Sequence, residues 1–528
     1  MTGRRFVPML VGAATAVVAV ASVAPEGLAQ SPQHGGTVTA VYSVETNTLF
    51  SPVGSGGNAL FTGTKVLERL LRLEHDGTFT PQLATAWSVS NGGRTYTFDL
   101  RENVRWHDGE PFDAEDVEFT ALKMWKEVGA NPMLKRIASA RVLAPHVIEI
   151  SYNDPTPEFT TLASLAGSGG LVIPKHLYQG TELTQNRYNN NPVGTGPFKF
   201  KAWVRGSHVA FVRNDDYWDA PLPYLDKLVI RYIQDRGARA AAMEAGEVQV
   251  GVSTPLSRQD INRLKAMPRF EVSGQGALAE FMNVEMNLSN PILANAKVRQ
   301  AIVRSLDQNF VANTLMRGLG TVANGPIAPW HPFYNADVQT RYTLDLERAK
   351  ALLDAAGYPE KKGGRFTLRV VVTPWYEENI QMGSVIRQQL GRIGVKVQLE
   401  TPDRSAAIRQ IYVDREFDLA VSNNVSYMDP VLRTTLLYTT ENIGRPFGNA
   451  SGYSNPDLDR IAQGMLFETD ASQRVVMANE LQRIVSEDIP IFPVAWKGNV
   501  MIYDRSVHNV TVRPEVQYDS WKDMWIEK

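Results

Sequence analysis

The stretch VGTGPFKFKAWVRGSHVAFVRNDDYW, from Val193 to Trp218, says most about how this chain folds. Gly194 and Gly196 leave the backbone free to turn, and Pro197 then fixes φ. Apolar residues alternate on both sides of Gly206, which predicts two strands joined by a tight turn. We therefore expect a β-hairpin that begins after a Gly-Pro turn and ends just before Tyr217 and Trp218.

A second hairpin is predicted upstream, in WSVSNGGRTYTFDL from Trp87 to Leu100. Asn91-Gly92 is a strong signal for a two-residue turn, and two aromatic residues fall on one face of the returning strand. The block VRWHDGEPF (Val104–Phe112) follows, and its Asp-Gly dipeptide favours a turn over a catalytic His-Asp pair. Asp113 then has the side chain and the position to cap a helix.

Helices and strands alternate through the second half of the chain. Short connections between such units are typical of a parallel sheet with helices on its faces, so the fold class is α/β. Thr37 to Tyr42 also alternates as a strand, and the polar segment after it, Glu45–Asn58, is expected to be a loop at the strand's carboxyl end, where ligands often bind. The predicted units are a helix capped by Asn295, a helix from Asp345 to Ala356, a strand from Phe366 to Val372, a helix from Glu378 to Ile393, a strand from Val395 to Glu400, a helix from Ser405 to Val413 and a strand from Phe417 to Ser422.

These blocks, in this order, resemble family 5 of the periplasmic solute-binding proteins, the peptide, nickel and oligosaccharide receptors of ABC importers. The hairpin stretch and the WHDG block are similar to its signatures. Further resemblance runs through PQLATAWSVSNGGRTYTFDLR (Pro81–Arg101), KVRQAIVRSLD (Lys297–Asp307) and SGYSNPDLD (Ser451–Asp459). The resemblance implies a two-lobed periplasmic binding protein fold with an extra β-rich subdomain in the first lobe, closing at a double hinge.

Pattern and resemblance together give the expected domain boundaries. A signal peptide is expected at 1–29, the first lobe at 30–275 with 76–188 as its β-rich subdomain, the second lobe at 276–488 and a C-terminal return to the first lobe at 489–528. Phe270–Glu285 and Ile489–Trp496 are the candidate crossings between the lobes.

The first residues indicate export. Arg4 and Arg5 precede an apolar run from Phe6 to Ala24, and small residues before Gln30 suit a signal peptidase. The run is about the minimum length for a bilayer and is interrupted by proline and glycine, which favours a cleaved signal over a membrane anchor. Since the chain has no cysteine, neither a lipid-anchored cysteine nor a disulfide can form. We expect a soluble periplasmic protein.

Composition argues against several classes of function. A net charge of -2 over 528 residues gives no basic surface for nucleic acid. The eight histidines are scattered, no HExxH or GxSxG motif occurs, and the glycine-rich loops lead to no Lys-Ser or Lys-Thr pair. We therefore expect no catalytic residue, no metal, no cofactor and no ATP site. Import would draw its energy from separate permease and ATPase subunits, and the binding protein itself is expected to be a monomer.

The charged anchors of dipeptide-binding relatives are missing. In those relatives an aspartate after the last parallel strand neutralises the ligand's ammonium, and an arginine at the end of an earlier strand takes its carboxylate. Aligning VSNNVSYMDP (Val421–Pro430) through Asp429 puts Ser426 at the position of that aspartate, and Thr373 falls roughly at that of the arginine. Because an unpaired buried charge is costly, this chain departs from the dipeptide pattern at both ends.

Other polar and aromatic residues are candidates to line the cleft. Asn423, with its neighbours on the same segment, suits a hydroxyl-rich or amide-rich ligand, unless these residues hold a turn or cap the next helix. Glu280 is either a partner for a cationic ligand or half of an interlobe salt bridge. The aromatic candidates can stack on a ligand or line the core. The candidate ligand-binding residues are Thr46, Asn47, Glu280, Trp330, Thr373, Trp375, Tyr376, Asn423, Asn424, Ser426 and Asp429.

These observations predict an extracytoplasmic receptor that closes around a peptide-like or other polar solute and presents it to an ABC permease. A sugar, an opine-like conjugate or a modified peptide fits the residues. A periplasmic sensor or chaperone-like module with the same fold is the alternative, and a hydrolase is the third hypothesis. Neighbouring genes for permeases and ATPases would favour transport, and a neighbouring sensor kinase would favour signalling.

Overall fold

A computed structural model describes the chain from residue 31 to residue 528, except residues 51–56, 75, 130, 168, 253–254, 274–278, 330, 339–341, 427–428, 499 and 511–517. The expected signal peptide and Trp330 lie outside the described residues.

The first lobe is built on a seven-stranded sheet. Its strands, in spatial order, are β12 (Phe270–Ser273), β19 (Met501–Asp504), β11 (Val250–Gly251), β1 (Thr37–Tyr42), β10 (Lys227–Tyr232), β9 (His208–Arg213) and β8 (Phe198–Val204). β1 lies in the middle and pairs in parallel with β10 and β11. β8 and β9 form an antiparallel hairpin at one edge, so the opening stretch folds as predicted, with Gly206 at its turn (φ 74°).

Helices α5 (Arg236–Glu244) and α6 (Arg258–Lys265) belong to this lobe, as does the short α1 (Gly57–Gly63). The loop expected over Glu45–Asn58 therefore ends early, because α1 takes its last two residues. α5 and α6 pack on the β11 and β19 side of the sheet through buried side chains such as Met243, Ile261 and Ile502.

The second lobe is built on a six-stranded sheet. Its strands, in spatial order, are β14 (Gly320–Val322), β18 (Ile491–Lys497), β13 (Ala279–Met286), β17 (Leu419–Ser426), β15 (Phe366–Val372) and β16 (Val395–Glu400). β15 pairs in parallel with both β16 and β17, which confirms the parallel unit predicted from the alternating pattern. β13 and β18 add antiparallel pairs.

Helices cover both faces of this sheet. α8 (Ala296–Ser305), α10 (Leu346–Ala355) and α11 (Glu377–Gly391) pack on one face, and α13 (Pro456–Met465) and α14 (Ala471–Asp488) on the other. The side chains of Asn295 and Asp345 cap α8 and α10, as predicted. The helix expected over 405–413 is α12 (Arg404–Ile408) followed by a π-helical turn, η7 (Arg409–Val413). β17 runs four residues beyond the predicted strand end at Ser422.

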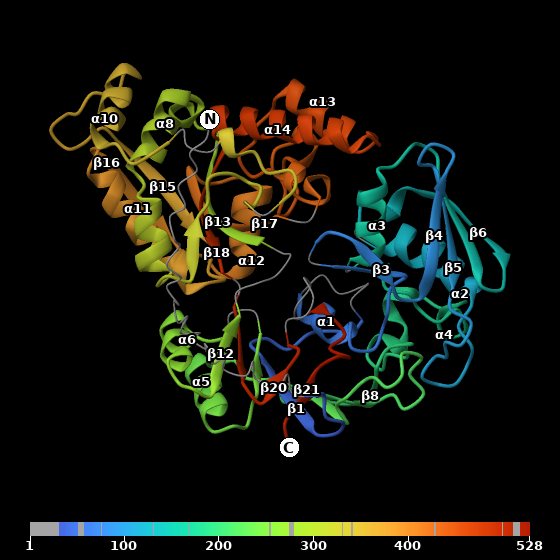
Figure 1. Cartoon of the computed structure of the whole chain (residues 1–528). Helices are drawn as coiled ribbons and strands as arrows, with labels where there is room; N and C mark the ends of the chain where they lie inside the picture. The colour runs from blue at the N-terminus through green and yellow to red at the C-terminus, as the bar shows by residue number, and fades with distance from the viewer. Residues whose placement is uncertain are drawn as a thin grey trace, which may run out of the picture.

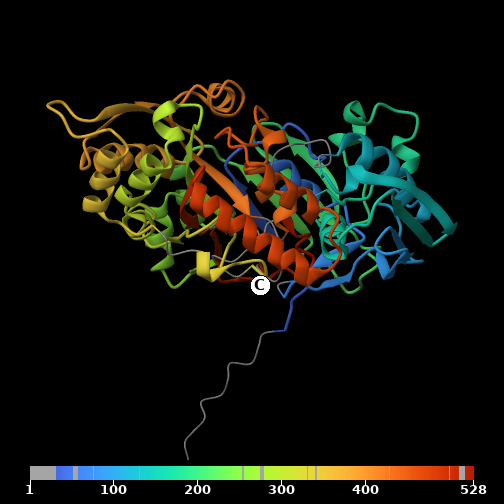
Figure 2. The same ribbon diagram turned by 90° about the horizontal axis from the view of Figure 1, so that it is seen from above.

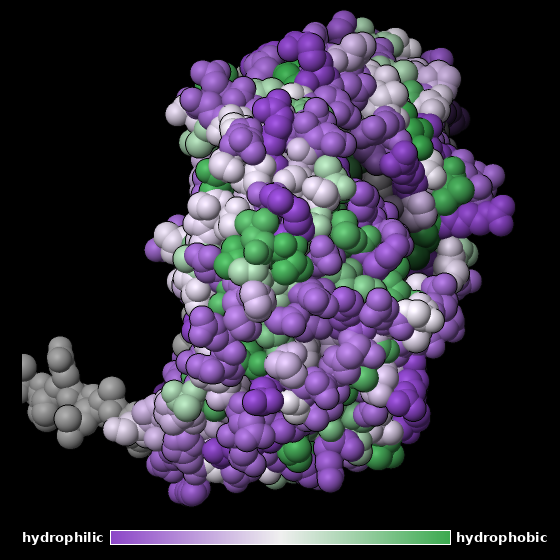
Figure 3. All heavy atoms as spheres, turned by 90° about the vertical axis from the view of Figure 1, so that its right-hand side faces the viewer, coloured by the Kyte–Doolittle hydropathy of each residue, from purple (hydrophilic) through white to green (hydrophobic). Residues whose placement is uncertain are grey.

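The β-rich subdomain is a separate four-stranded antiparallel sheet, with the order β4 (Ala84–Ser90), β5 (Thr95–Leu100), β7 (Val147–Tyr152) and β6 (Ile137–Ala144). α2 (Ala114–Phe119), continued by η1 (Thr120–Val128), and α3 (Glu158–Ala166) pack with it around one core. Asp113 caps α2 through a reciprocal capping box with Asp116. The surface on this side is mostly polar, with an apolar patch near its centre (Figure 3).

Short elements complete the chain. They are β2 (Leu71–Leu73), β3 (Phe79–Pro81), β20 (Val507–His508), β21 (Trp525–Ile526), α4 (Lys175–Tyr178), α7 (Pro291–Ala294) and α9 (Gln308–Phe310), the π-helical segment η5 (Val311–Leu315), and the 3₁₀ turns η2 (Leu134–Arg136), η3 (Leu183–Gln185), η4 (Arg187–Asn189), η6 (Ala336–Val338), η8 (Pro430–Leu432), η9 (Thr434–Leu437) and η10 (Thr440–Asn442).

The chain passes between the two large sheets twice. β12 and β13 are consecutive strands in different sheets, and so are β18 and β19. Figures 1 and 2 show the resulting arrangement, with the body around β13 and β17 beside the body around β1 and the β-rich sheet at one end. Because β18 pairs with β13, we propose that the C-terminal return to the first lobe begins after Lys497 rather than at residue 489.

Candidate functional site

The two lobes contact each other at two separate places. Near the crossings, side chains of α5 and α6 reach the start of α11. On the far side, residues of the β-rich subdomain reach the loops around η8 and α13. In the described part of the chain these contacts include Arg258–Glu378 (2.6 Å), Arg236–Glu377 (3.0 Å), Thr160–Asp429 (2.5 Å) and the Arg136 guanidinium over the Phe467 ring (4.3 Å to its centre). The region between the two contacts is the candidate site.

Asp429 forms the far contact and is completely buried. Its Oδ2 accepts a hydrogen bond from the Thr160 hydroxyl on α3, and Arg474 pairs with the same carboxylate at 2.8 Å. Its other oxygen accepts from the Val431 backbone N–H and caps η8. Both oxygens of Asp429 are engaged in these contacts, and through Thr160 they join the two lobes.

A charged cluster lies where β13 and β18 run side by side. Glu280 and Lys497 are directly paired strand residues of the second lobe, with 3.3 Å between carboxylate and ammonium. Burial lowers the pKa of Lys497, although Glu280 and Glu378 oppose the shift. The Lys497 ammonium lies 2.9 Å from the centre of the Tyr376 ring. Glu280 therefore forms a cross-strand pair within one lobe. The interlobe salt bridge, one of the two hypotheses for this residue, does not form with Lys497.

Tyr376 faces the first lobe from the start of α11. Its hydroxyl donates to Glu280 at 3.3 Å. The negative charge of Glu280, then burial, raises the pKa of Tyr376 well above its ordinary value, and Tyr42 and Tyr518 of the first lobe add to the shift. Tyr376 consequently lies close to the end of β1, on the inner side of the second lobe.

Arg258 of α6 bridges the lobes with only part of its guanidinium. Its Nε donates to Glu378 at 2.6 Å, and its side chain is 3% exposed. Burial disfavours the charge on Glu378, but Lys497 and Arg258 together lower the pKa of that carboxyl. Within the described part of the chain, neither Nη1 nor Nη2 of Arg258 has a hydrogen-bond partner. A buried guanidinium thus presents two open donor groups.

The carboxyl end of β15 carries a short polar chain. Thr373 is fully buried, and its hydroxyl donates to the Val421 carbonyl (3.0 Å) and accepts from the Asn379 amide (2.7 Å). Asn379 also donates to the Asn423 side-chain carbonyl at 2.5 Å. Among the described residues, the Asn423 amide nitrogen is buried without a partner. Thr373 is therefore occupied, while Asn423 offers one open donor.

β17 is longer than the strand beside it. β15 pairs with β17 only as far as Val421, whereas β13 pairs with it as far as Ser426. Asn423 and Asn424, as neighbours on a strand, leave on opposite faces. Asn424 turns into the lobe and donates to Asn283 (3.1 Å) and Glu285 (3.2 Å). Ser426 is buried on the same face, with no partner for its hydroxyl among the described residues.

Three described candidates remain: Trp375, Thr46 and Asn47. The Trp375 ring lies 6.0 Å from Phe447 and under the Arg404 guanidinium, and its indole N–H has no partner among the described residues. The Thr46 hydroxyl is engaged in a local turn with Thr48. Asn47 is exposed on the loop after β1.

Sequence reasoning missed four residues of the site: Arg258, Glu378, Asn379 and Lys497. Arg258 and Glu378 fall in the first turns of helices, where charged side chains are ordinarily solvated. Lys497 ends an apolar strand, and only its position opposite Glu280 in the sheet reveals a partner. The sequence offers one signal for such residues, which is a charged side chain such as Lys497 in an otherwise apolar strand.

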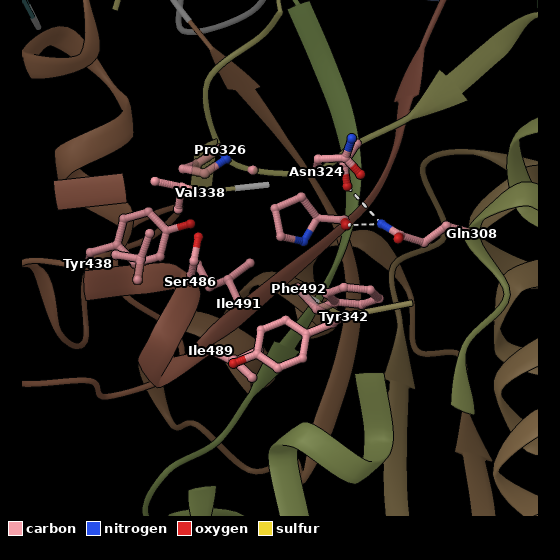
Figure 4. Close-up of a pocket in the computed structure, with 14 residues that line it drawn as sticks. Gln308, Asn324, Pro326, Val338, Tyr342, Tyr438, Ser486, Ile489, Ile491 and Phe492 are labelled. Carbon is pink, nitrogen blue, oxygen red and sulfur yellow. Dashed lines mark hydrogen bonds between the residues drawn. The ribbon is translucent and has the colours of Figure 1, made fainter. Parts of the chain in front are cut away.

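Two hollows lie elsewhere in the second lobe. A cavity of about 40 Å³ is lined by Gln308, Tyr438, Ser486 and Phe492, among others, and Figure 4 shows the hydroxyls of Tyr438 and Ser486 pointing toward each other. A space of this size holds one or two waters and no solute. A groove of about 480 Å³ runs along α13 and α14, with Arg460, Glu480 and Arg483 on its walls.

The described residues hold neither a membrane-spanning helix nor a metal-binding cluster. None of their helices combines the length and the apolar character needed to cross a bilayer. Nor do their His, Cys, Asp and Glu side chains gather in threes around a point where a metal ion would fit.

Comparison with known proteins gives a consistent answer. A sequence profile for bacterial extracellular solute-binding proteins, family 5, matches residues 78–445. The chain is 24% identical to the oligopeptide-binding protein AppA of Bacillus subtilis, over 95% of this chain and 93% of that one. It is 27% identical to heme-binding protein A of Haemophilus influenzae, over 84% of each chain. The structure of the ABC transporter-associated periplasmic binding protein DppA from Helicobacter pylori, in complex with the peptide STSA, superposes with a TM-score of 0.78 at 23% identity and covers 94% of this chain and 99% of that one.

Proposed function

Because the chain belongs to family 5 of the bacterial extracellular solute-binding proteins, we propose that its interlobe site takes a polar solute with an acid group. The chain is a two-lobed substrate-binding protein of the kind that serves ABC importers. Catalysis has no part in this proposal: the protein acts by enclosing the solute, as a monomer exported to the periplasm.

The proposal rests on buried hydrogen-bond donors of the site that have no acceptor among the described residues. Arg258 offers two NH2 groups, the Trp375 indole offers one N–H and the Asn423 amide offers one NH2 group, all buried and without partners in the described part of the chain. A buried donor without an acceptor costs about 1–3 kcal/mol, and more when it is charged. A ligand carboxylate satisfies the two guanidinium donors in parallel, and carbonyl or hydroxyl oxygens satisfy the other two. The Asn379 side-chain carbonyl is also buried without a partner among the described residues, so the site has more open donors than acceptors, and the solute supplies the acceptors it lacks.

The same residues argue against a free dipeptide. The Thr373 hydroxyl is already bonded on both sides, and Ser426 has no charge with which to hold an ammonium. A dipeptide needs an opposite charge at each end within a short, fixed length. A blocked peptide, a sugar acid or an opine-like conjugate carries the acid group without that requirement.

Thermal unfolding with paired solutes tests the ligand class. N-acetyl-dialanine and glucuronate should raise the melting temperature more than free dialanine and glucose, because a ligand stabilises the native state by mass action. Native mass spectrometry of protein purified without refolding checks the same point by weighing any retained solute. A large shift with free dialanine that disappears when its amino end is blocked would contradict the proposal.

Arg258→Met tests the anchor itself. Removing a charge-assisted pair of hydrogen bonds should raise the Kd for the best acid solute by about 10- to 100-fold. Arg236→Met is the matched control, because Arg236 also pairs with a glutamate of α11 (Glu377) but is 40% exposed, and it should change the Kd less than about twofold. Isothermal titration measures both variants. Equal Kd values for Arg258→Met and the wild type would remove Arg258 from the site.

A further inference from the structure

Two glutamates are buried in this protein with opposite arrangements of partners. Glu68 in the first lobe accepts hydrogen bonds on both oxygens, from Gln82 and Tyr217 on one and from Thr195 and Trp218 on the other, at 2.7–3.1 Å. This is the arrangement expected of a structural carboxyl group, because each lone pair that left water has found a donor.

Glu285 on β13 is as deeply buried, yet it uses only one oxygen. Its Oε1 accepts from Asn283 (3.0 Å), Ser422 (2.9 Å) and Asn424 (3.2 Å). Its Oε2 has no hydrogen-bond partner within the described part of the chain. Burial raises the pKa of this carboxyl, and the bonds to Oε1 and the more distant charge of Arg433 oppose the shift. Three donors orient this carboxyl group and leave its second oxygen open.

One other open oxygen lies on the same side of the sheet. The side-chain carbonyl of Asn424 is buried without a partner among the described residues, whereas the Tyr412 hydroxyl bonds with Ser422 and the Tyr438 hydroxyl points toward Ser486 (Figure 4). Burial first, and the negative charge of Glu285 second, raise the pKa of Tyr412 and of Tyr438, so both rings lie within reach of its field. Asn424 therefore places an open carbonyl oxygen beside Glu285.

A row of polar residues leads from Glu285 toward the candidate site. Ser422, Asn424 and Ser426 alternate on one face of β17, and all three are buried. Ser422 and Asn424 contact Glu285, whereas Ser426 lies at the end of β17, three residues before the interlobe contact of Asp429 with Thr160. Alternate positions on a buried strand face are ordinarily apolar, so this row is costly unless something polar uses it.

We propose that Glu285 holds an ammonium group of the bound solute, inserted along this row. An ammonium has three N–H donors and no acceptor, which matches the open oxygen of Glu285 beside the open carbonyl of Asn424. A divalent metal ion fits less well, because the described residues supply a single carboxylate there and no acidic cluster. The inference rests on the proposed function. It adds that the solute carries a cationic group away from its acid group, in place of the α-ammonium of a dipeptide.

Methylammonium and tetramethylammonium are the probes that test Glu285. Methylammonium chloride at 100 mM should raise the melting temperature of the wild type by about 2 °C or more over the same concentration of sodium chloride. Tetramethylammonium carries the charge without N–H groups and should give no such rise. Glu285→Gln keeps the shape and the bonds to Oε1 and should abolish the methylammonium effect.

Glu68→Gln is the matched control. It removes a buried carboxylate whose two oxygens are both bonded, so it should lower the melting temperature and keep the methylammonium shift intact. Three results would overturn the proposal: no shift in the wild type, an equal shift in Glu285→Gln, or an equal shift with tetramethylammonium. None of them bears on Arg258 or on acid solutes, so the proposed function stands or falls separately.

Discussion

At the scale of single residues, the surroundings of His107 fix its protonation state. Its Nδ1 accepts from the Gly194 backbone N–H (3.3 Å), and its Nε2 lies 2.9 Å from the Gly196 carbonyl. Both bonds are satisfied only by the neutral ring with its proton on Nε2. Burial lowers the pKa of His107 to about 4. The residue that resembled a catalytic partner of Asp108 thus stabilises the Gly-Pro turn of the hairpin.

The pH dependence of stability follows from this pKa. Between about pH 6.5 and pH 4 the unfolded state binds a proton at His107 and the native state does not. The stabilisation is therefore complete above pH 6.5 and is lost as the pH falls. His107→Gln should remove up to one proton, or about 1.4 kcal/mol per pH unit, from the slope of the free energy of unfolding in this window. Denaturant titrations at each pH measure the difference, and parallel curves for wild type and variant would refute it.

Single residues also mark the limit of what the sequence reveals about the site. Ser426 and Thr373 stood out because the pattern of relatives placed charges there. Arg258 and Lys497 did not, because a cation in a first helical turn or at a strand end is usually solvated. Their importance depends on the partner that the fold brings opposite each of them. That information is three-dimensional.

At the scale of elements, the hairpin depends on Gly194 and Gly196, whose positions leave no room for a side chain. A Cβ on Gly194 would lie 1.9 Å from the Val66 carbonyl oxygen, and one on Gly196 would lie 2.6 Å from it. The backbone of the turn packs directly on the backbone near Val66, which explains the Gly-x-Gly-Pro pattern of the opening stretch.

Gly194→Ala should therefore cost about 3 kcal/mol or more, since backbone must move to admit the methyl group. Gly391→Ala is the control: it lies in the last turn of α11, where a Cβ meets nothing within 4 Å, and alanine there should stabilise by up to about 1 kcal/mol. Chemical denaturation compares the two. A loss below 1 kcal/mol in Gly194→Ala would show that the turn relaxes freely.

Most elements could be predicted from the sequence because their signals are local. Alternation gave β15 and β16 at their observed bounds, and the side chains of Asn295 and Asp345 gave two helix starts. β17 is the instructive exception. Its polar half, from Asn423 to Ser426, resembles a loop in the sequence, yet it pairs with β13 throughout. A strand with buried polar residues is stable only where partners or a ligand satisfy them, and local pattern does not report those.

At the scale of the whole molecule, the two lobes meet on both sides of the site. Arg258 and Glu378 join them near the crossings, and Thr160 and Asp429 join them at the far side. The contacts near the crossings can survive a hinge motion, whereas the far contact must break for a solute to enter. The arrangement described here is thus the closed one. A solute shifts the protein toward it only by binding the closed form more tightly than the open form.

The central claim is that solute binding closes the lobes, and small-angle X-ray scattering measures this most directly. Protein stripped of bound solute by unfolding and refolding should have a larger radius of gyration than the same protein saturated with the acid solute that stabilises it best. Adding that solute should return the scattering curve to the one calculated for the closed arrangement. Identical scattering with and without a solute that raises the melting temperature would contradict the account.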